Sequence, residues 1–178
     1  MKYVDIYTVS GNGRNSPVCR KNNNIVGAGA TLPKWHLPGL RHAFSIFANA
    51  TSDSRFTTSA ALLENYGNNV VSKIDPASTA LAPEERTHPI LTSAVLWYEG
   101  DDEKTHQDAV RYVTRIRDAL NEGVDREKGK RHTYVNYAFG DETVRETYGY
   151  EEWRVEKLKK LKKLWDPRNE FGYYVPLV

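Results

Sequence analysis

Cysteine is almost absent from this sequence, and so are long apolar runs. Cys19 stands alone, which excludes a disulfide framework and any zinc site built from several cysteines. No stretch approaches the roughly 18 apolar residues that a membrane-spanning helix needs. The first residues, MKYVDIYTVSGNG, hold no continuous apolar segment of signal-peptide length. We therefore expect a cytoplasmic protein with no membrane partner.

The net charge is also small, and the common metal-ligand and nucleophile motifs do not occur. The formal charge is only +2 at pH 7, whereas nucleic-acid-binding domains carry a clustered basic excess, so we expect no nucleic-acid partner. The histidines show no metal-ligand spacing, so we expect no metal, and no G-x-S-x-G nucleophile motif occurs. The segment VGAGAT (26–31) lacks the third glycine of a dinucleotide-binding loop. That pattern favours a tight turn or a close backbone approach.

What the sequence does contain is an alternation of strand-like and helix-like segments. A length of 178 residues fits a single domain, residues 1–178, without a covalent or metal staple. Residues 90–98 (ILTSAVLWY) are mostly apolar at odd and at even positions alike, which indicates a central strand covered on both faces. Further strands are expected at 3–9, 57–66 and 132–139. Helices are expected at 38–49, from Asp101 or Asp102 to Gly123, at 141–148 and at 150–165. This order predicts an α+β fold, an antiparallel or mixed sheet with helices packed on one face.

The last helix ends in KLKKLKKLW (157–165), a basic amphipathic pattern. Such a helix can lie on an anionic membrane surface. Three glutamates dilute the charge at its start, and acid before lysine also suits the helix dipole. We therefore favour an ordinary surface helix, followed by an apolar tail, FGYYVPLV (171–178), that docks on the domain.

Residues 132–150, HTYVNYAFGDETVRETYGY, concentrate tyrosines next to an asparagine. A buried tyrosine commonly fills a core while its hydroxyl finds a partner, but in a pocket it can also donate or accept a proton. On a strand, alternate residues face opposite sides. One side would carry His132, Tyr134, Asn136 and Ala138, and the other Thr133, Val135, Tyr137 and Phe139.

The same segment carries a family resemblance. YVNY (134–137), the lysine- and leucine-rich helix and the D-P-x-N-x-F sequence at 166–171 resemble the C-terminal region of the berberine bridge enzyme-like family of FAD-linked oxidoreductases. AFGDE (138–142) is similar to the fungal branch, as is TALAPEER (79–86). The resemblance covers about residues 57–178 and implies the fold of that family's substrate domain.

The resemblance also implies roles for single residues. The second tyrosine of the motif, Tyr137, would act as general acid or base, and Asn136 would lie near the flavin and donate a hydrogen bond. Tyr134, Trp97 and Phe139 are expected to line a substrate site. The family's flavin-binding domain has no counterpart in these 178 residues, so we expect no cofactor, with FAD present only if a partner domain supplies it.

From these points we predict a cyclase or isomerase that acts without flavin on a small hydrophobic metabolite. Positioning and a tyrosine acid or base would drive ring closure or a proton shift. One alternative is a fragment or split subunit of an FAD-linked oxidoreductase whose flavin comes from another chain. A second alternative is a binding module without catalysis. We also expect a two-fold homodimer, because an exposed apolar sheet face needs a cover.

Overall fold

A three-stranded antiparallel sheet organises the computed structural model, which describes residues 23–124 and 130–177. The strands are β1 (Asn23–Leu32), β2 (Ala60–Asn65) and β3 (Ile90–Glu99), in the order β1-β3-β2. The central strand and the strand expected at 57–66 are therefore confirmed. The strand expected at 3–9 lies outside the described residues.

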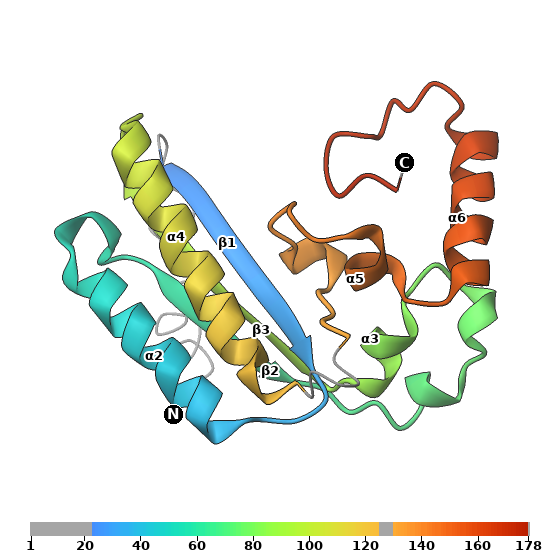
Figure 1. Ribbon diagram of the computed structural model, residues 1–178, viewed down its shortest axis with the longest axis horizontal. Helices are drawn as coiled ribbons and strands as arrows, with labels where there is room; N and C mark the ends of the chain where they lie inside the picture. The colour runs from blue at the N-terminus through green and yellow to red at the C-terminus, as the bar shows by residue number, and fades with distance from the viewer. Residues whose placement is uncertain (1–22, 125–129, 178) are drawn as a thin grey trace, which may run out of the picture.

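Two long helices, α2 (Leu37–Ser52) and α4 (Glu103–Leu120), lie side by side against one face of this sheet (Figure 1). Their contact with the sheet forms the core, in which Ala28, Leu96, Ala109 and Val113 are completely buried. The expected α+β fold with helices on one face is confirmed.

The ends of both helices follow from local side chains. Asp102 accepts a hydrogen bond from the backbone N–H of Thr105 at 2.8 Å and so caps α4, as its sequence predicts. The imidazole of His36 does the same for Gly39 at the start of α2, at 3.2 Å. Beyond Leu120 the chain makes one 3₁₀ turn, Asn121–Gly123.

Three further helices lie on the side of β1 away from α2 and α4 (Figure 1). They are α3 (Pro83–Thr87), α5 (Val144–Tyr148) and α6 (Glu152–Trp165). Further 3₁₀ turns span Ser54–Phe56, Val71–Lys73, Pro76–Ser78 and Val135–Tyr137. Among the described residues, no helix has both the length and the apolar character to cross a membrane.

Arg154 anchors α6 to the loop before α3. Its side chain is 2% exposed and donates to the carbonyl oxygens of Pro76 at 2.6 Å and Thr79 at 3.2 Å. This loop holds two 3₁₀ turns and no strand, so the buried guanidinium, which has several donors, satisfies carbonyl oxygens that no neighbouring strand reaches.

The strand expected at 132–139 is wrong. Only the first hydrogen bond of a ladder forms, from the N–H of Thr31 to the carbonyl of His132 at 2.8 Å. The N–H of Tyr134 then donates to the Thr31 side chain at 3.1 Å instead of to backbone, and the 3₁₀ turn follows. The predicted alternation of side chains therefore does not occur, and Tyr134 and Tyr137 point toward one another.

Candidate functional site

The face of the sheet turned away from α2 and α4 is called here the far face. Ala28 and Ala30 pack in the cores beneath those helices, so Gly27, Gly29 and Thr31 point the other way. Antiparallel register then places a set of side chains from β3 and β2 on the same face. This set comprises Leu91, Ser93, Val95 and Trp97 of β3, and Leu62 and Glu64 of β2.

Tyr137 crosses the far face directly over Gly29. A Cβ atom at Gly29 would lie 2.8 Å from the Cβ of Tyr137 and 3.0 Å from the carbonyl oxygen of Thr92. Only glycine, which has no Cβ, allows the tyrosine to pack this close to the strand. The close backbone approach expected from VGAGAT is therefore confirmed, and its partner is Tyr137.

The hydroxyl of Tyr137 reaches Glu64 on the opposite edge strand. It donates to one carboxylate oxygen at 2.6 Å, and the hydroxyl of Tyr66 donates to the other at 2.9 Å. Burial, followed by the hydrogen bond to Glu64, raises the pKa of Tyr137 far above its ordinary value. Tyr137 therefore keeps its proton at neutral pH and donates the hydrogen bond that Glu64 accepts.

Tyr134 and Asn136 complete this group. The rings of Tyr134 and Tyr137 meet edge to face, with centroids 5.8 Å apart. The amide of Asn136 donates to the hydroxyl of Tyr134 at 2.8 Å. The structure therefore brings together three of the residues named by the sequence, Tyr134, Asn136 and Tyr137, and adds Glu64 to them.

An ion pair fixes the segment that carries these residues. The guanidinium of Arg117 in α4 binds both carboxylate oxygens of Asp141, at 2.5 and 2.9 Å. The hydrogen bond from Arg117 lowers the pKa of Asp141. Glu142 accepts from the backbone N–H groups of Phe139 and Gly140 at 3.0 and 2.8 Å. The chain is thus held on both sides of β1, with Tyr137 on the far face and the next turn against α4.

The two other predicted substrate residues lie apart from this group. Phe139 packs into the core beneath α4 with Val113 and Leu96. Trp97 is on the far face but four residues along β3 from Ser93, which corresponds to about 13 Å. It is 8% exposed, and its indole N–H has no hydrogen-bond partner among the described residues.

The sequence reasoning missed Glu64 and Ser93. Ser93 pairs in register with Gly29, the residue that Tyr137 covers, and its hydroxyl is buried without a partner among the described residues. A glutamate within the strand pattern TTSAALLENY was the available signal for Glu64, because a carboxylate on a half-buried strand face needs a donor.

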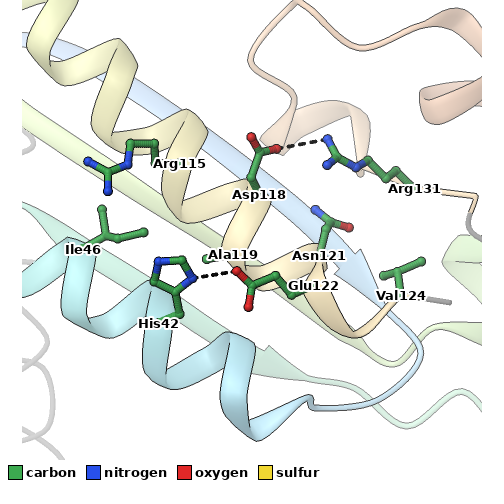
Figure 2. Close-up of a pocket in the computed structure, with 9 residues that line it drawn as sticks. All are labelled: His42, Ile46, Arg115, Asp118, Ala119, Asn121, Glu122, Val124 and Arg131. Atoms are coloured by element: carbon green, nitrogen blue, oxygen red, sulfur yellow. Dashed lines mark hydrogen bonds and ion pairs between the residues drawn. The ribbon is translucent and has the colours of Figure 1, made fainter. Parts of the chain in front are cut away.

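A polar pocket of about 340 Å³ lies elsewhere, between the ends of α2 and α4 (Figure 2). His42 approaches Glu122 at 2.6 Å, and Arg131 donates to Asp118 at 3.0 Å. None of the predicted site residues lines it, and most of its charges neutralise one another. We therefore place the candidate site on the far face. Groups of histidine, cysteine and acidic residues able to hold a metal are absent from the described part of the chain.

Comparison with known proteins relates the chain to flavin enzymes. A family model described as "Berberine and berberine like" matches residues 133–174. FAD-linked oxidoreductase chry5 of Gibberella zeae is 34% identical over 98% of this chain and 34% of the relative. FAD-linked oxidoreductase chyH of Penicillium rubens is 36% identical over 82% of this chain and 29% of the relative. The chain thus spans about one third of the length of these curated fungal relatives.

Solved structures agree with the fold. The flavoenzyme CrmK, involved in caerulomycin biosynthesis, superposes on 95% of this chain with a TM-score of 0.66 and 21% identity, over 35% of its own length. Carbohydrate oxidase from Microdochium nivale covers 87% of this chain with a TM-score of 0.63 and 18% identity, over 32% of its own length. At these identities the likeness concerns the fold alone.

The relatives correct one expectation. The prediction of a protein without a cofactor is wrong, because the matched curated proteins are FAD-linked oxidoreductases. The VGAGAT segment does not form a cradle for the phosphates of FAD. The glycines of VGAGAT lie inside β1, where Gly29 is covered by Tyr137, and a phosphate loop needs free backbone N–H groups at a helix start.

Proposed function

Because this chain belongs to the berberine bridge enzyme-like family and spans about one third of its relatives' length, we propose that it forms the substrate side of an FAD-linked oxidoreductase. The flavin would be bound by polypeptide that corresponds to the remainder of those relatives. The single observation that supports this proposal most directly is the Tyr137–Glu64 hydrogen bond on the far face.

The proposed site combines an acid–base pair with apolar surroundings. Glu64 is the proton acceptor, and Tyr137 holds its carboxylate in place. A substrate hydroxyl or acidic C–H that approaches the carboxylate in place of Tyr66, which is 52% exposed, can pass its proton to Glu64. Tyr137 then remains a donor to the resulting carboxyl group or to a substrate oxygen. Oxidation itself is the chemistry of the flavin.

The surrounding far face favours a hydrophobic metabolite as substrate. Ile25 and Leu62 are 54% and 40% exposed on this face, and Val95 lies between their strands. Apolar side chains around a few polar groups are the usual composition of a small-molecule site. We propose the cytoplasm as the place of action. Cyclisation or isomerisation without flavin stays a prediction, and the geometry of the site does not favour it over oxidation.

The test begins with the natural state of the chain. An epitope-tagged copy is isolated from the cells that make it, and its visible spectrum and bound polypeptides are recorded. We expect flavin absorbance together with additional polypeptide, either covalently continuous or associated. A catalytically active preparation that contains no flavin would refute the proposal.

Substitutions then locate the proton transfer. Mass spectrometry of cell extracts would first identify the metabolite that the protein oxidises. Glu64→Gln should lower the turnover of this substrate by roughly 10²–10⁴-fold, and Tyr137→Phe should lower it less. Tyr66→Phe is the matched control, because it removes a hydroxyl from the same carboxylate at its exposed side. Equal activity of Glu64→Gln and Tyr66→Phe would mean that Glu64 is structural.

A further inference from the structure

The chain that follows α6 turns back onto the segment that carries Tyr137. Residues 166–177 are called here the tail. Figure 1 shows the tail leaving the end of α6 and returning toward α5. The D-P-x-N-x-F sequence at 166–171 forms the start of the tail, and none of its side chains belongs to the group around Tyr137.

Asp166 fixes the point at which the chain reverses direction. Its carboxylate accepts hydrogen bonds from the backbone N–H groups of Glu170 at 2.8 Å and Phe171 at 3.1 Å. Lys162 of α6 donates to the same carboxylate and to the carbonyl oxygen of Phe171, the latter at 3.1 Å. The hydrogen bond from Lys162 lowers the pKa of Asp166. The start of the tail is therefore tied to the last turn of the helix.

Two tyrosine hydroxyls hold the other end of the tail. Tyr174 donates to the carbonyl oxygen of Ala138, and Tyr148 of α5 donates to the carbonyl oxygen of Val175 at 2.9 Å. Burial raises the pKa of both hydroxyls, so both keep their protons at neutral pH. Ala138 directly follows Tyr137 and caps its 3₁₀ turn. The tail thus holds this turn at the carbonyl next to Tyr137.

The backbone of Val175 is strained. Its φ is 44°, in the left-handed region that is unfavourable for a residue with a Cβ and most of all for a β-branched one. Val175 is nevertheless only 6% exposed. Such a conformation persists only where the surrounding contacts impose it, and strained residues cluster in segments that switch. The attachment of the tail therefore depends on its contacts, against the preference of its own backbone.

We propose that the tail is a strap that positions Tyr137 and so regulates the far-face site. With the strap attached, Tyr174 holds the carbonyl of Ala138. Tyr137 then lies over Gly29, and its hydroxyl reaches Glu64 at 2.6 Å. The regulation of catalysis rests on the proposed function, whereas the positioning of Tyr137 can be measured on the whole chain without any substrate.

Release of the strap frees the turn that carries Tyr137. The turn loses the hydrogen bond from Tyr174, and Val175 leaves its left-handed conformation. The hydrogen bond from Tyr148 opposes this release, because it keeps the carbonyl of Val175 in place. Tyr148 and Tyr174 are therefore positioning residues, which act on the site through Ala138 and contact no reacting atom.

Nuclear magnetic resonance of the isotope-labelled whole chain tests the proposal. One measurement is the hydrogen exchange of the backbone amides of residues 137–140. The other is the chemical shift of the Gly29 amide, which responds to the tyrosine ring packed against that residue. Tyr174→Phe removes one hydroxyl. The exchange of residues 137–140 should become about 2–10-fold faster, as expected for the loss of one hydrogen bond, and the Gly29 signal should move.

Tyr173→Phe is the matched control. Tyr173 is the neighbour of Tyr174 in the tail, is 98% exposed, and makes no hydrogen bond through its hydroxyl among the described residues. This variant should change neither measurement. Tyr148→Phe should resemble Tyr174→Phe, because it releases the same strap at Val175.

A second pair of variants tests the strain. Val175→Gly and Val175→Ala both remove the buried side chain, but only glycine adopts a positive φ without a steric penalty. The strap should therefore detach more readily in the alanine variant, and residues 137–140 should exchange about 2–10-fold faster in it than in the glycine variant. Equal or slower exchange in the alanine variant would contradict the role of the strained valine.

The strap is overturned if Tyr174→Phe leaves both measurements unchanged, or if Tyr173→Phe changes them equally. It is also overturned if exchange rises only within the tail and the Gly29 signal stays in place, because the tail would then not position Tyr137. None of these measurements uses activity. The strap can therefore fail while the proposed function stands, and an active preparation without flavin would refute that function while leaving the strap intact.

Discussion

The sheet with its two helices and the C-terminal helix with its tail are stabilised in opposite ways. In the first region apolar side chains are inside: Leu96 and Val113 are completely buried. In the second, apolar side chains are outside, and Trp165 and Tyr173 are 80% and 98% exposed. The most deeply buried side chain there is that of Arg154, at 2%, and only two small apolar side chains, Val155 and Val175, are buried with it, at 6% each.

This contrast separates stability from recognition. Apolar burial drives folding of the sheet layer at roughly 25 cal/mol per Å². The C-terminal region is positioned by directed hydrogen bonds, such as that from the hydroxyl of Tyr148 to the carbonyl of Val175 at 2.9 Å. Polar anchoring leaves its apolar side chains available to another surface.

The largest expected effect is in the sheet layer. Leu96→Ala should lower the free energy of unfolding by about 2–5 kcal/mol, because it opens a cavity between β3 and α4. Leu62→Ala, on the same sheet but 40% exposed, is the control and should cost much less. Urea denaturation measures both, and equal losses would contradict the assignment of the core to the helix-covered face.

The polar anchor should come next. Arg154→Met keeps most of the side-chain volume but leaves the carbonyls of Pro76 and Thr79 without their donor, at a cost of about 1–3 kcal/mol. Hydrogen exchange should rise first in α6 and residues 76–82, before the sheet. Arg168 is the control: its side chain is 83% exposed, so Arg168→Met should change neither the free energy of unfolding nor the hydrogen exchange of these segments. An equal rise in hydrogen exchange along the whole chain would show that the two regions are not separately stabilised.

The Arg117–Asp141 ion pair joins the regions and should respond to pH. The pKa of Asp141 is lowered in the folded chain by Arg117, so the stabilisation is complete well above 3.8, the ordinary value, and is lost as pH falls through and below it. The side chain of Asp141 is 47% exposed, so solvent screening limits the effect to about 1 kcal/mol or less.

Denaturation at several acidic pH values measures this effect. Asp141→Asn should flatten the acid dependence of stability, and Asp118→Asn, which removes a carboxylate from a pair with Arg131 on the surface, is the control. A wild-type chain whose acid dependence matches that of Asp141→Asn would contradict the role of this pair.

The difference between the regions also explains what the sequence could predict. A continuous apolar run identified β3, and apolar periodicity identified α4, because Ala109, Val113 and Ile116 are buried by the same pattern that defines the helix. Residues 132–139 carry a strand-like composition, but their conformation depends on a hydrogen bond from the backbone of Tyr134 to the side chain of Thr31, which is 103 positions away. No local pattern encodes such contacts.

The candidate site follows the same rule. The resemblance to the family drew attention to Tyr134, Asn136 and Tyr137, and the structure places these residues together. It could not identify Glu64, because that contact spans 73 positions and depends on the register of β2 with β3. The contact between Tyr137 and Gly29 likewise could not be predicted, because the two residues are far apart in sequence and meet only in the folded sheet.

The smallest expected effect is at the exposed side chains of α6. A core leucine truncated to alanine costs about 2–5 kcal/mol, but Leu161 is 40% exposed, so Leu161→Ala should cost less than about 1 kcal/mol in the monomer. Lys160→Gln should stay within about 0.5 kcal/mol, as surface substitutions do. Both values come from urea denaturation. A loss at Leu161 as large as that at Leu96 would mean that α6 is a core helix after all, and the distinction between a region built for folding and a region left open for binding would no longer hold.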